Sequence, residues 1–180
     1  MVETWIPLNS LPSGGLSLTV DDPAVWDDPV REFKLGCLVR QPLKADVFLL
    51  SQEDGCFVRG HLTGEVSLPC DRCAEDAIVE LDVHFETFEP IPGAAAEDEE
   101  EDAELDESVM RMGESGPEIN VAVLLWEEFS LALPIHPLCR AQCAGLCPSC
   151  GKNLNEGPCN CAKDEGDPRL ATLRGLTLNK

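Results

Sequence analysis

The cysteines near the carboxyl terminus constrain this 180-residue chain most, because six of its ten lie between Cys139 and Cys161. Within this segment, the run Cys-Pro-Ser-Cys-Gly places two thiols on one tight turn, which Gly151 can close by taking a positive φ. Turn-forming residues then bring the chain back towards the last two cysteines. Four thiolates in a tetrahedron are the usual ligands of a structural Zn²⁺. We therefore predict a structural zinc site with the ligands Cys147, Cys150, Cys159 and Cys161.

The same segment leaves other ligand sets open, since six thiols compete for four positions. Cys139 and Cys143 can replace one pair of the predicted ligands, and an iron–sulfur cluster is an alternative because four cysteines also hold iron. A closed set of four thiolates leaves no coordination position for a substrate. The predicted role of the metal is to stabilise a segment too small to form its own core.

Composition and cysteine spacing predict a soluble cytoplasmic protein. The amino-terminal residues lack a basic stretch followed by an apolar one, and no apolar run approaches the roughly 18 to 20 residues of a membrane span. Paired cysteines without an export signal favour reduced metal ligands over disulfides. With 43% hydrophobic residues, the chain can form one domain of ordinary size with a small metal-held appendage.

The net charge of −21 is unevenly distributed. Residues 1–138 carry 7 basic and 30 acidic side chains, whereas residues 139–180 carry 6 basic and 4 acidic ones. The acidic part repels nucleic acid and attracts basic proteins, so the cysteine-rich segment is the part suited to contact phosphate. Its candidate RNA contacts are Arg140, Lys152, Lys163, Arg169 and Arg174.

Alternating apolar and polar residues predict two long strands in the middle of the chain. Residues 58–68 and 79–85 both place apolar or small side chains at every second position. Gly60 and Gly64 predict a bulge or a sharp bend in the first strand. We expect the two strands to pair antiparallel.

Shorter apolar runs predict further strands. Asp54-Gly55 is typical of a hairpin turn and joins residues 47–50 to a strand that starts at Cys56. Residues 16–20 and 35–39 are candidate strands in the amino-terminal segment.

Two helices and an acidic loop complete the expected elements. Residues 97–107 hold nine acids in eleven positions, which predicts a disordered loop. Asn120 can cap a helix that Pro134 ends, and its apolar residues recur at helical spacing. Residues 167–175 predict a short helix that docks the cysteine-rich module on the body.

These elements predict an α+β fold: an antiparallel, strongly bent and partly barrel-like β-sheet, covered by one or two helices, with a small carboxyl-terminal zinc-binding module. The expected parts are an amino-terminal segment with short strands (1–44), the β body (45–91), the acidic loop (92–117), the packing helix (118–138) and the zinc module with its helix (139–180).

A second C-x-x-C motif lies at the turn between the two long strands. Cys70 and Cys73 are interpreted as a structural pair whose intervening Arg72 points at a partner, with half of a second metal site and a redox pair as alternatives. No βαβ pattern of a thioredoxin-like fold surrounds the motif. Cys37 and Cys56 stand in apolar contexts and are predicted to be buried.

The histidines and the sequence motifs give no indication of an enzyme. His61 and His84 are predicted on the polar faces of their strands. His136 is predicted on the surface, with a role as a metal ligand beside Cys139 as the alternative. Nucleophile elbows, phosphate-binding glycine loops and HExxH helices are absent from the sequence.

The order of several motifs resembles the YceD family, the large ribosomal RNA subunit accumulation proteins. The motifs are Leu68-Pro-Cys-Asp-Arg-Cys73, Leu133-Pro134, Gly145-Leu-Cys-Pro-Ser-Cys-Gly151, Leu154-Asn155, Cys159-Asn-Cys161 and Asp167-Pro-Arg-Leu-Ala-Thr-Leu173. The resemblance implies a bacterial cytoplasmic factor needed for accumulation of 23S ribosomal RNA, without implying catalysis. The chain departs from the pattern in its acidic loop and in Ala74, where a leucine is usual.

Three hypotheses follow for the function. The first is a ribosome-biogenesis factor that associates with ribosomal RNA or a pre-large-subunit particle, with no membrane and no small-molecule substrate. The second is an acidic adaptor that holds a basic ribosomal protein, because a body of charge −23 attracts such a partner. The third is a thiol redox protein acting through Cys70 and Cys73.

Overall fold

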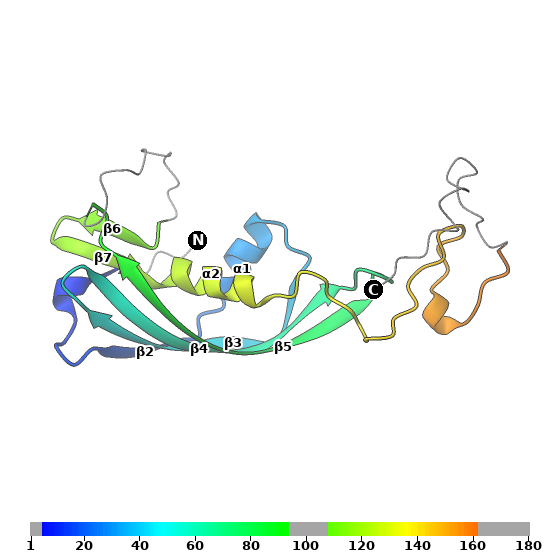
Figure 1. Cartoon of the computed structure of the whole chain (residues 1–180), viewed down its shortest axis with the longest axis horizontal. Coiled ribbons are helices and arrows are strands. Elements are labelled where there is room, and N and C mark those ends of the chain that lie inside the picture. Colours follow the sequence, from blue (N-terminus) through cyan, green and yellow to red (C-terminus); the bar gives the residue numbers. More distant parts are fainter. Residues whose placement is uncertain (1–4, 94–107, 162–180) are drawn as a thin grey trace, which may run out of the picture.

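A four-stranded antiparallel sheet forms the body of the protein in the computed structural model, which describes residues 5–93 and 108–161 (Figure 1). In spatial order its strands are β2 (Leu16–Val20), β3 (Leu38–Ser51), β4 (Gly55–Pro69) and β5 (Asp76–Pro90). The sheet is strongly curved, with β2 and β5 at its two edges. Because these edges do not pair with each other, the sheet is open. The strong bend was predicted, but among the described residues the sheet does not close into a barrel.

The long strands β4 and β5 confirm the predicted pairing. They are antiparallel over their whole length, with Val58 opposite Thr87 and Leu68 opposite Ala77. Along β5 every second residue is buried or half-buried and the others are exposed, as the two-residue period requires. The C-x-x-C motif forms the turn between them, and the hairpin at Asp54-Gly55 joins β3 to β4 as predicted.

The two β4 glycines predicted to bend the strand have different surroundings in the sheet. The pairing of β3 with β4 shifts register between Gln41 and Lys44, beside Gly64, whose φ is +149°. Gly60 lies directly opposite Phe85 on β5, and the phenyl ring fills the space that a side chain at Gly60 would need. An aromatic ring over a facing glycine is a common way to stabilise a curved sheet.

Gly60→Ala is therefore expected to lower the free energy of unfolding by about 1–3 kcal/mol, because the new methyl group overlaps the Phe85 ring. Urea unfolding monitored by circular dichroism measures the effect. The control is Gly14→Ala, since a Cβ at Gly14 has no neighbour within 4 Å. Equal unfolding midpoints for the two variants would contradict this packing.

Two helices cover one face of the sheet, α1 (Ala24–Glu32) and α2 (Val121–Ala132) (Figure 1). The predicted cap of α2 is confirmed, since the Asn120 side-chain oxygen accepts hydrogen bonds from the N–H groups of Ala122 and Val123. Helix α1 was not predicted. Of the candidate strand at residues 35–39, only Leu38 and Val39 belong to β3.

A second antiparallel sheet of three short strands was also not predicted. Its strands are β1 (Trp5–Pro7), β7 (Gly116–Asn120) and β6 (Met110–Gly113), in that order. The expected acidic loop therefore ends earlier than residue 117, because β6 and the first residues of β7 lie within its predicted range. Residues 97–107, where the acids cluster, lie outside the described residues.

The core lies between the large sheet and the two helices. Trp26 of α1 packs on Phe129 of α2, with ring centroids 5.9 Å apart, and both side chains are fully buried. Cys37 and Cys56 are buried in the same core, as predicted from their apolar contexts. Among the described residues, no helix is both long and apolar enough to cross a membrane.

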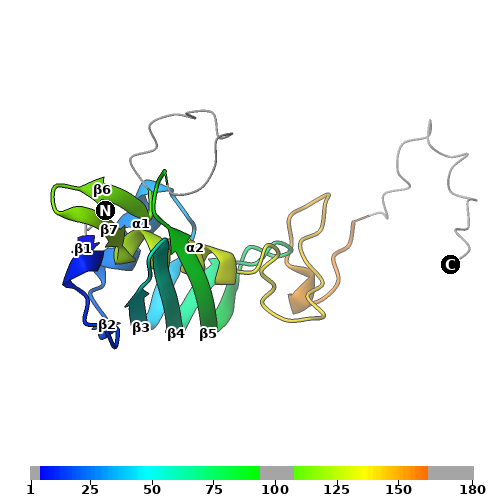
Figure 2. The ribbon, with the colours of Figure 1, turned by 60° about the vertical axis from the view of Figure 1, so that its left-hand side comes forward.

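The carboxyl-terminal segment leaves the helical layer after α2 and runs past the β4–β5 turn (Figure 2). It contains one short 3₁₀ helix, η2 (Leu154–Glu156), and a single β-bridge between Leu146 and Asn153. The helix predicted at residues 167–175 lies outside the described residues.

Candidate metal centres

Eight of the ten cysteines gather into two sets of four. We define the proximal set, beside the β4–β5 turn, as Cys70, Cys73, Cys139 and Cys143. We define the distal set, farther along the chain, as Cys147, Cys150, Cys159 and Cys161. The four sulfur atoms of each set lie within 4.8 Å of one another, so each set could hold a metal ion.

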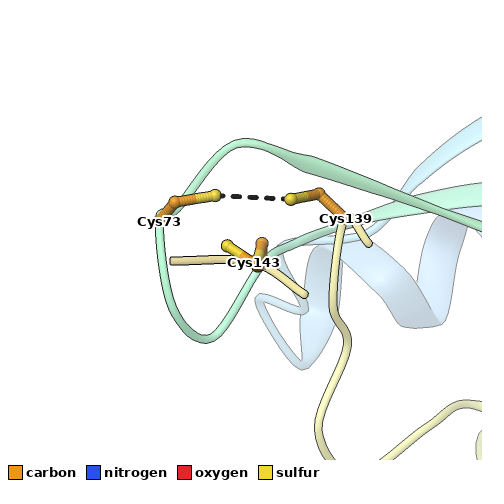
Figure 3. A group of neighbouring side chains, drawn as sticks. Cys73, Cys139 and Cys143 are labelled. Atoms are coloured by element: carbon orange, nitrogen blue, oxygen red, sulfur yellow. Dashed lines mark hydrogen bonds between the residues drawn. The ribbon is translucent and has the colours of Figure 1, made fainter. Parts of the chain in front are cut away.

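The structure places the residues singled out in the sequence as follows. The four ligands predicted from spacing come together as the distal set. The two alternative ligands, Cys139 and Cys143, lie instead with Cys70 and Cys73. Figure 3 shows Cys73 and Cys139 facing each other, one from the β4–β5 turn and one from the carboxyl-terminal segment. Spacing along the chain did not predict this meeting of two distant segments.

The sulfur separations fit a tetrahedral thiolate site. A Zn–S bond of about 2.3 Å places the four sulfurs of a regular tetrahedron about 3.8 Å apart. The observed sulfur distances are 3.9 Å for Cys70 and Cys143, 3.6 Å for Cys73 and Cys139, and 3.4 Å for Cys147 and Cys159. A disulfide would bring two sulfurs to about 2.0 Å, and all of these cysteines are free thiols.

The distal turn has the backbone conformation that its sequence predicts. Gly151 takes a φ of +71°, and its N–H donates to the carbonyl of Cys147 at 2.8 Å. The N–H of Cys147 in turn donates to the carbonyl of Lys152 at 2.8 Å. This closed turn points the thiols of Cys147 and Cys150 to one side, where those of Cys159 and Cys161 meet them.

Gly151→Ala is expected to destabilise this turn by about 1–2 kcal/mol, because an L-residue is strained at a left-handed φ. The added methyl group meets no atom within 4 Å, so the effect is purely one of backbone strain. Amide hydrogen exchange at residue 151 measures it, with Ser149→Ala as a control in the same exposed turn. Equal exchange rates in the two variants would contradict the assignment.

The thiols of each set have divergent acidities. In the proximal set, the backbone N–H of Cys139 lowers the pKa of Cys70 to about 6, whereas burial raises the pKa of Cys139 to about 12. In the distal set, the backbone N–H groups of Cys150 and Ser149 lower the pKa of Cys147 to about 6. A first thiolate thus forms readily and opposes ionisation of its neighbours. A bound divalent cation would offset that repulsion.

The carboxyl-terminal segment has little apolar material of its own. Within residues 139–161 the buried positions are Cys143, Gly145 and Cys147, so that no aliphatic side chain is fully buried there. Hydrophobic burial therefore contributes little to the folding of this segment. Bonds from thiolates to a metal are the usual replacement in segments of this kind.

A third group of potential ligands lies on the exposed face of the sheet. His61 and His84 face each other across β4 and β5, and His61 also contacts Asp82 at 2.6 Å. The two rings stack within 12° of parallel, with 3.9 Å between their centroids. Lone pairs in two parallel ring planes do not converge on one point, so this arrangement is a stacked cross-strand pair. Both histidines occupy the polar face, as predicted.

The structure describes two of the five basic residues predicted to contact RNA. Arg140 and Lys152 are exposed beside the two cysteine sets, whereas Lys163, Arg169 and Arg174 lie outside the described residues. The guanidinium of Arg72 donates to the Cys143 carbonyl at 2.9 Å, while Arg72 as a whole is exposed, so its contact with a partner stays a prediction.

An open antiparallel sheet under two helices, extended by two four-cysteine clusters, defines an α+β protein with a thiolate-rich module that could bind metal. The family model described as large ribosomal RNA subunit accumulation protein YceD matches residues 58–177, which include all eight clustered cysteines. The chain belongs to the YceD family. Membership implies a role in accumulation of the large-subunit ribosomal RNA, in a family not known for enzymes.

Individual relatives agree with this membership. An uncharacterized protein of Mycobacterium tuberculosis is 26% identical over 171 residues, covering 87% of this chain and 79% of its own length. A chloroplastic YCED homologue 1 of Arabidopsis thaliana, called a large ribosomal RNA subunit accumulation protein, is 24% identical over 155 residues, covering 75% of this chain and 48% of its own length. No solved structure shows a significant match.

Proposed function

We propose that this protein is a cytoplasmic, non-enzymatic ribosome-biogenesis factor that supports accumulation of 23S ribosomal RNA and assembly of the large subunit. The observation that carries the proposal is the family match over residues 58–177, which spans the β4–β5 hairpin, helix α2 and the cysteine-rich module. The named Arabidopsis relative adds support. The partner is ribosomal RNA or a pre-large-subunit particle.

The proposed cofactor is a structural Zn²⁺ held by the distal set of cysteines. Four thiolates with tetrahedral separations suit this ion and leave no open coordination position. The ion would order the segment that carries the exposed residues Arg140 and Lys152. This segment belongs to residues 139–180, which carry more basic than acidic side chains. Its contribution would thus be to present basic groups to phosphate on a rigid support.

Depletion of the protein in its own host tests this function. We expect the ratio of 23S to 16S ribosomal RNA to fall and the large-subunit peak to shrink in sucrose gradients. A plasmid copy of the wild-type gene should restore both. An unchanged ratio and an unchanged gradient would overturn the proposal.

A second candidate, an acidic adaptor for a basic ribosomal protein, has one observation in its favour. The outward face of the edge strand β5 presents four exposed carboxylates, Asp76, Glu80, Asp82 and Glu86, and all but Glu80 also contact a basic side chain of the same chain. Charges on an edge strand commonly serve to prevent edge-to-edge aggregation, so these carboxylates also have a structural explanation. Crosslinking in cells, followed by identification of both RNA and protein, separates the two candidates. A basic ribosomal protein recovered without RNA, and lost at high salt, would favour the adaptor.

The third candidate, a thiol redox protein, requires a reactive pair at Cys70 and Cys73. The lowered pKa of Cys70 agrees with it. However, Cys70 also contacts the sulfur of Cys143 at 3.9 Å, and Cys73 that of Cys139 at 3.6 Å, so the two thiols belong to a group of four and not to an isolated pair. Alkylation at pH 6 that leaves both cysteines unmodified would remove this candidate.

A further inference from the structure

We propose that the proximal set, Cys70, Cys73, Cys139 and Cys143, is a second tetrathiolate Zn²⁺ site that fastens the carboxyl-terminal segment to the β4–β5 turn. Three of its four cysteines are buried, and the sulfurs come from segments 66 or more residues apart in sequence. The close approach of the two segments at this point is visible in Figure 3. This inference concerns metal binding alone and does not depend on the ribosomal role.

The proximal turn repeats the backbone of the distal turn. In the distal turn the first cysteine donates its N–H to the carbonyl five residues on, and the residue after the second cysteine donates back to the first. The turn at Cys70 has the same two bonds, Cys70 N–H to Glu75 carbonyl and Ala74 N–H to Cys70 carbonyl, both at 2.8 Å. Two thiols of one C-x-x-C are therefore presented in the same way at both turns.

Ala74 keeps this conformation against a steric cost. Its φ is +60°, the counterpart of +71° at Gly151, although an L-residue there is disfavoured by roughly 1–2 kcal/mol. Among the described residues, the other non-glycine residue with positive φ is Lys34. Strained backbone of this kind persists where the surrounding structure enforces it, commonly at functional sites.

The carboxyl-terminal half of the site is held by contacts that aim it at the turn. The N–H of Asp71 donates to the Pro137 carbonyl at 2.9 Å, and the N–H of Leu146 donates to the Arg72 carbonyl at 3.0 Å. The side-chain amide of Asn155 donates to the sulfur of Cys143 at 3.3 Å. Hydrogen bonds to a ligand atom from outside the coordination sphere are a regular feature of metal sites.

The interior at this junction consists mainly of thiols. The small buried cluster here contains Ala77 and three of the cysteines, with Leu138 and Cys139 packed against it. Ala77 and Leu138 offer too little apolar surface to join two chain segments. A metal ion bound by two cysteines from each segment would supply the missing stabilisation.

Native mass spectrometry of the purified full-length protein, with elemental analysis, tests the proposal. We expect two Zn²⁺ per wild-type chain. The proximal variant, which combines Cys139→Ser and Cys143→Ser, should bind one Zn²⁺. The matched distal variant, which combines Cys159→Ser and Cys161→Ser, should also bind one. Both double substitutions lie outside the large sheet, so circular dichroism should show an intact body in each. The proximal variant should also lose the slow exchange of the Leu146 amide, which bonds to the turn.

Three results would overturn the proposal: two Zn²⁺ retained in the proximal variant, a single Zn²⁺ in the wild type that only the distal variant loses, or iron that is lost with Cys139 and Cys143. Cys70→Ser provides an independent check from the other segment and should give the same loss as the proximal variant. Because RNA takes no part in the measurement, these results are separate from failure of the proposed ribosomal function.

Discussion

Replacing Cys147 and Cys150 together with serine is expected to remove one metal ion per chain and to unfold residues 144–161 while the β body stays folded. The reason is that this segment buries no aliphatic side chain, so hydrophobic packing cannot stabilise it once the metal is lost. Structural zinc sites contribute roughly 10–16 kcal/mol of apparent binding free energy, far more than a short exposed segment gains by other means. Unfolding of residues 144–161 should therefore be complete, not partial.

Limited trypsin digestion combined with metal analysis measures this prediction. Cleavage after Lys152 should be slow in the wild type and fast in the variant. In the folded turn the Lys152 carbonyl accepts a hydrogen bond from the Cys147 N–H, and the Lys152 side chain donates to the Pro158 carbonyl at 3.0 Å. The control is Cys37→Ser, which changes a buried cysteine outside both sets. A serine variant that keeps its metal and its resistance to trypsin would contradict the role of the distal set.

Phe129→Ala is expected to lower the free energy of unfolding of the body by about 3–5 kcal/mol, the range for a buried phenylalanine replaced by alanine. Phe129 is 0% exposed and packs between Trp26 and Trp126, with ring centroids at 5.9 Å and 5.4 Å. Its removal leaves a cavity at the contact between the two helices and weakens their hold on the sheet.

Urea unfolding with linear extrapolation measures the loss. Leu131→Ala on the same helix is the matched control, because Leu131 is 80% exposed and should change stability by no more than about 0.5 kcal/mol. Similar losses for the two variants would show that the helix does not pack as described.

The elements with strong periodicity could be predicted from the sequence. Strands β4 and β5 alternate over more than ten residues, and α2 carries both a capping asparagine and a terminating proline. Long patterns of this kind report burial on one face, which is what fixes the element in the fold. The distal cysteine set could be predicted from a different signal, the short spacing of its four cysteines along the chain.

Elements whose stability comes from distant contacts could not be predicted. Helix α1 is nine residues long, contains Pro29 and is charged on its outer face, so that its buried Trp26 and Val25 give too short a pattern. Strands β1, β6 and β7 have three to five residues each. The proximal set joins cysteines on either side of more than sixty residues, and spacing alone cannot show which segments meet.

The central claim is that metal ions bound by cysteines order the carboxyl-terminal segment. Amide NMR spectra of the ¹⁵N-labelled full-length protein, recorded before and after treatment with a strong chelator, test it most directly. We predict that the signals of residues 138–161 collapse to the positions of an unfolded chain after chelation, while those of β3 and β4 stay in place. An unchanged spectrum, from a preparation whose metal analysis shows no bound ion, would contradict the account.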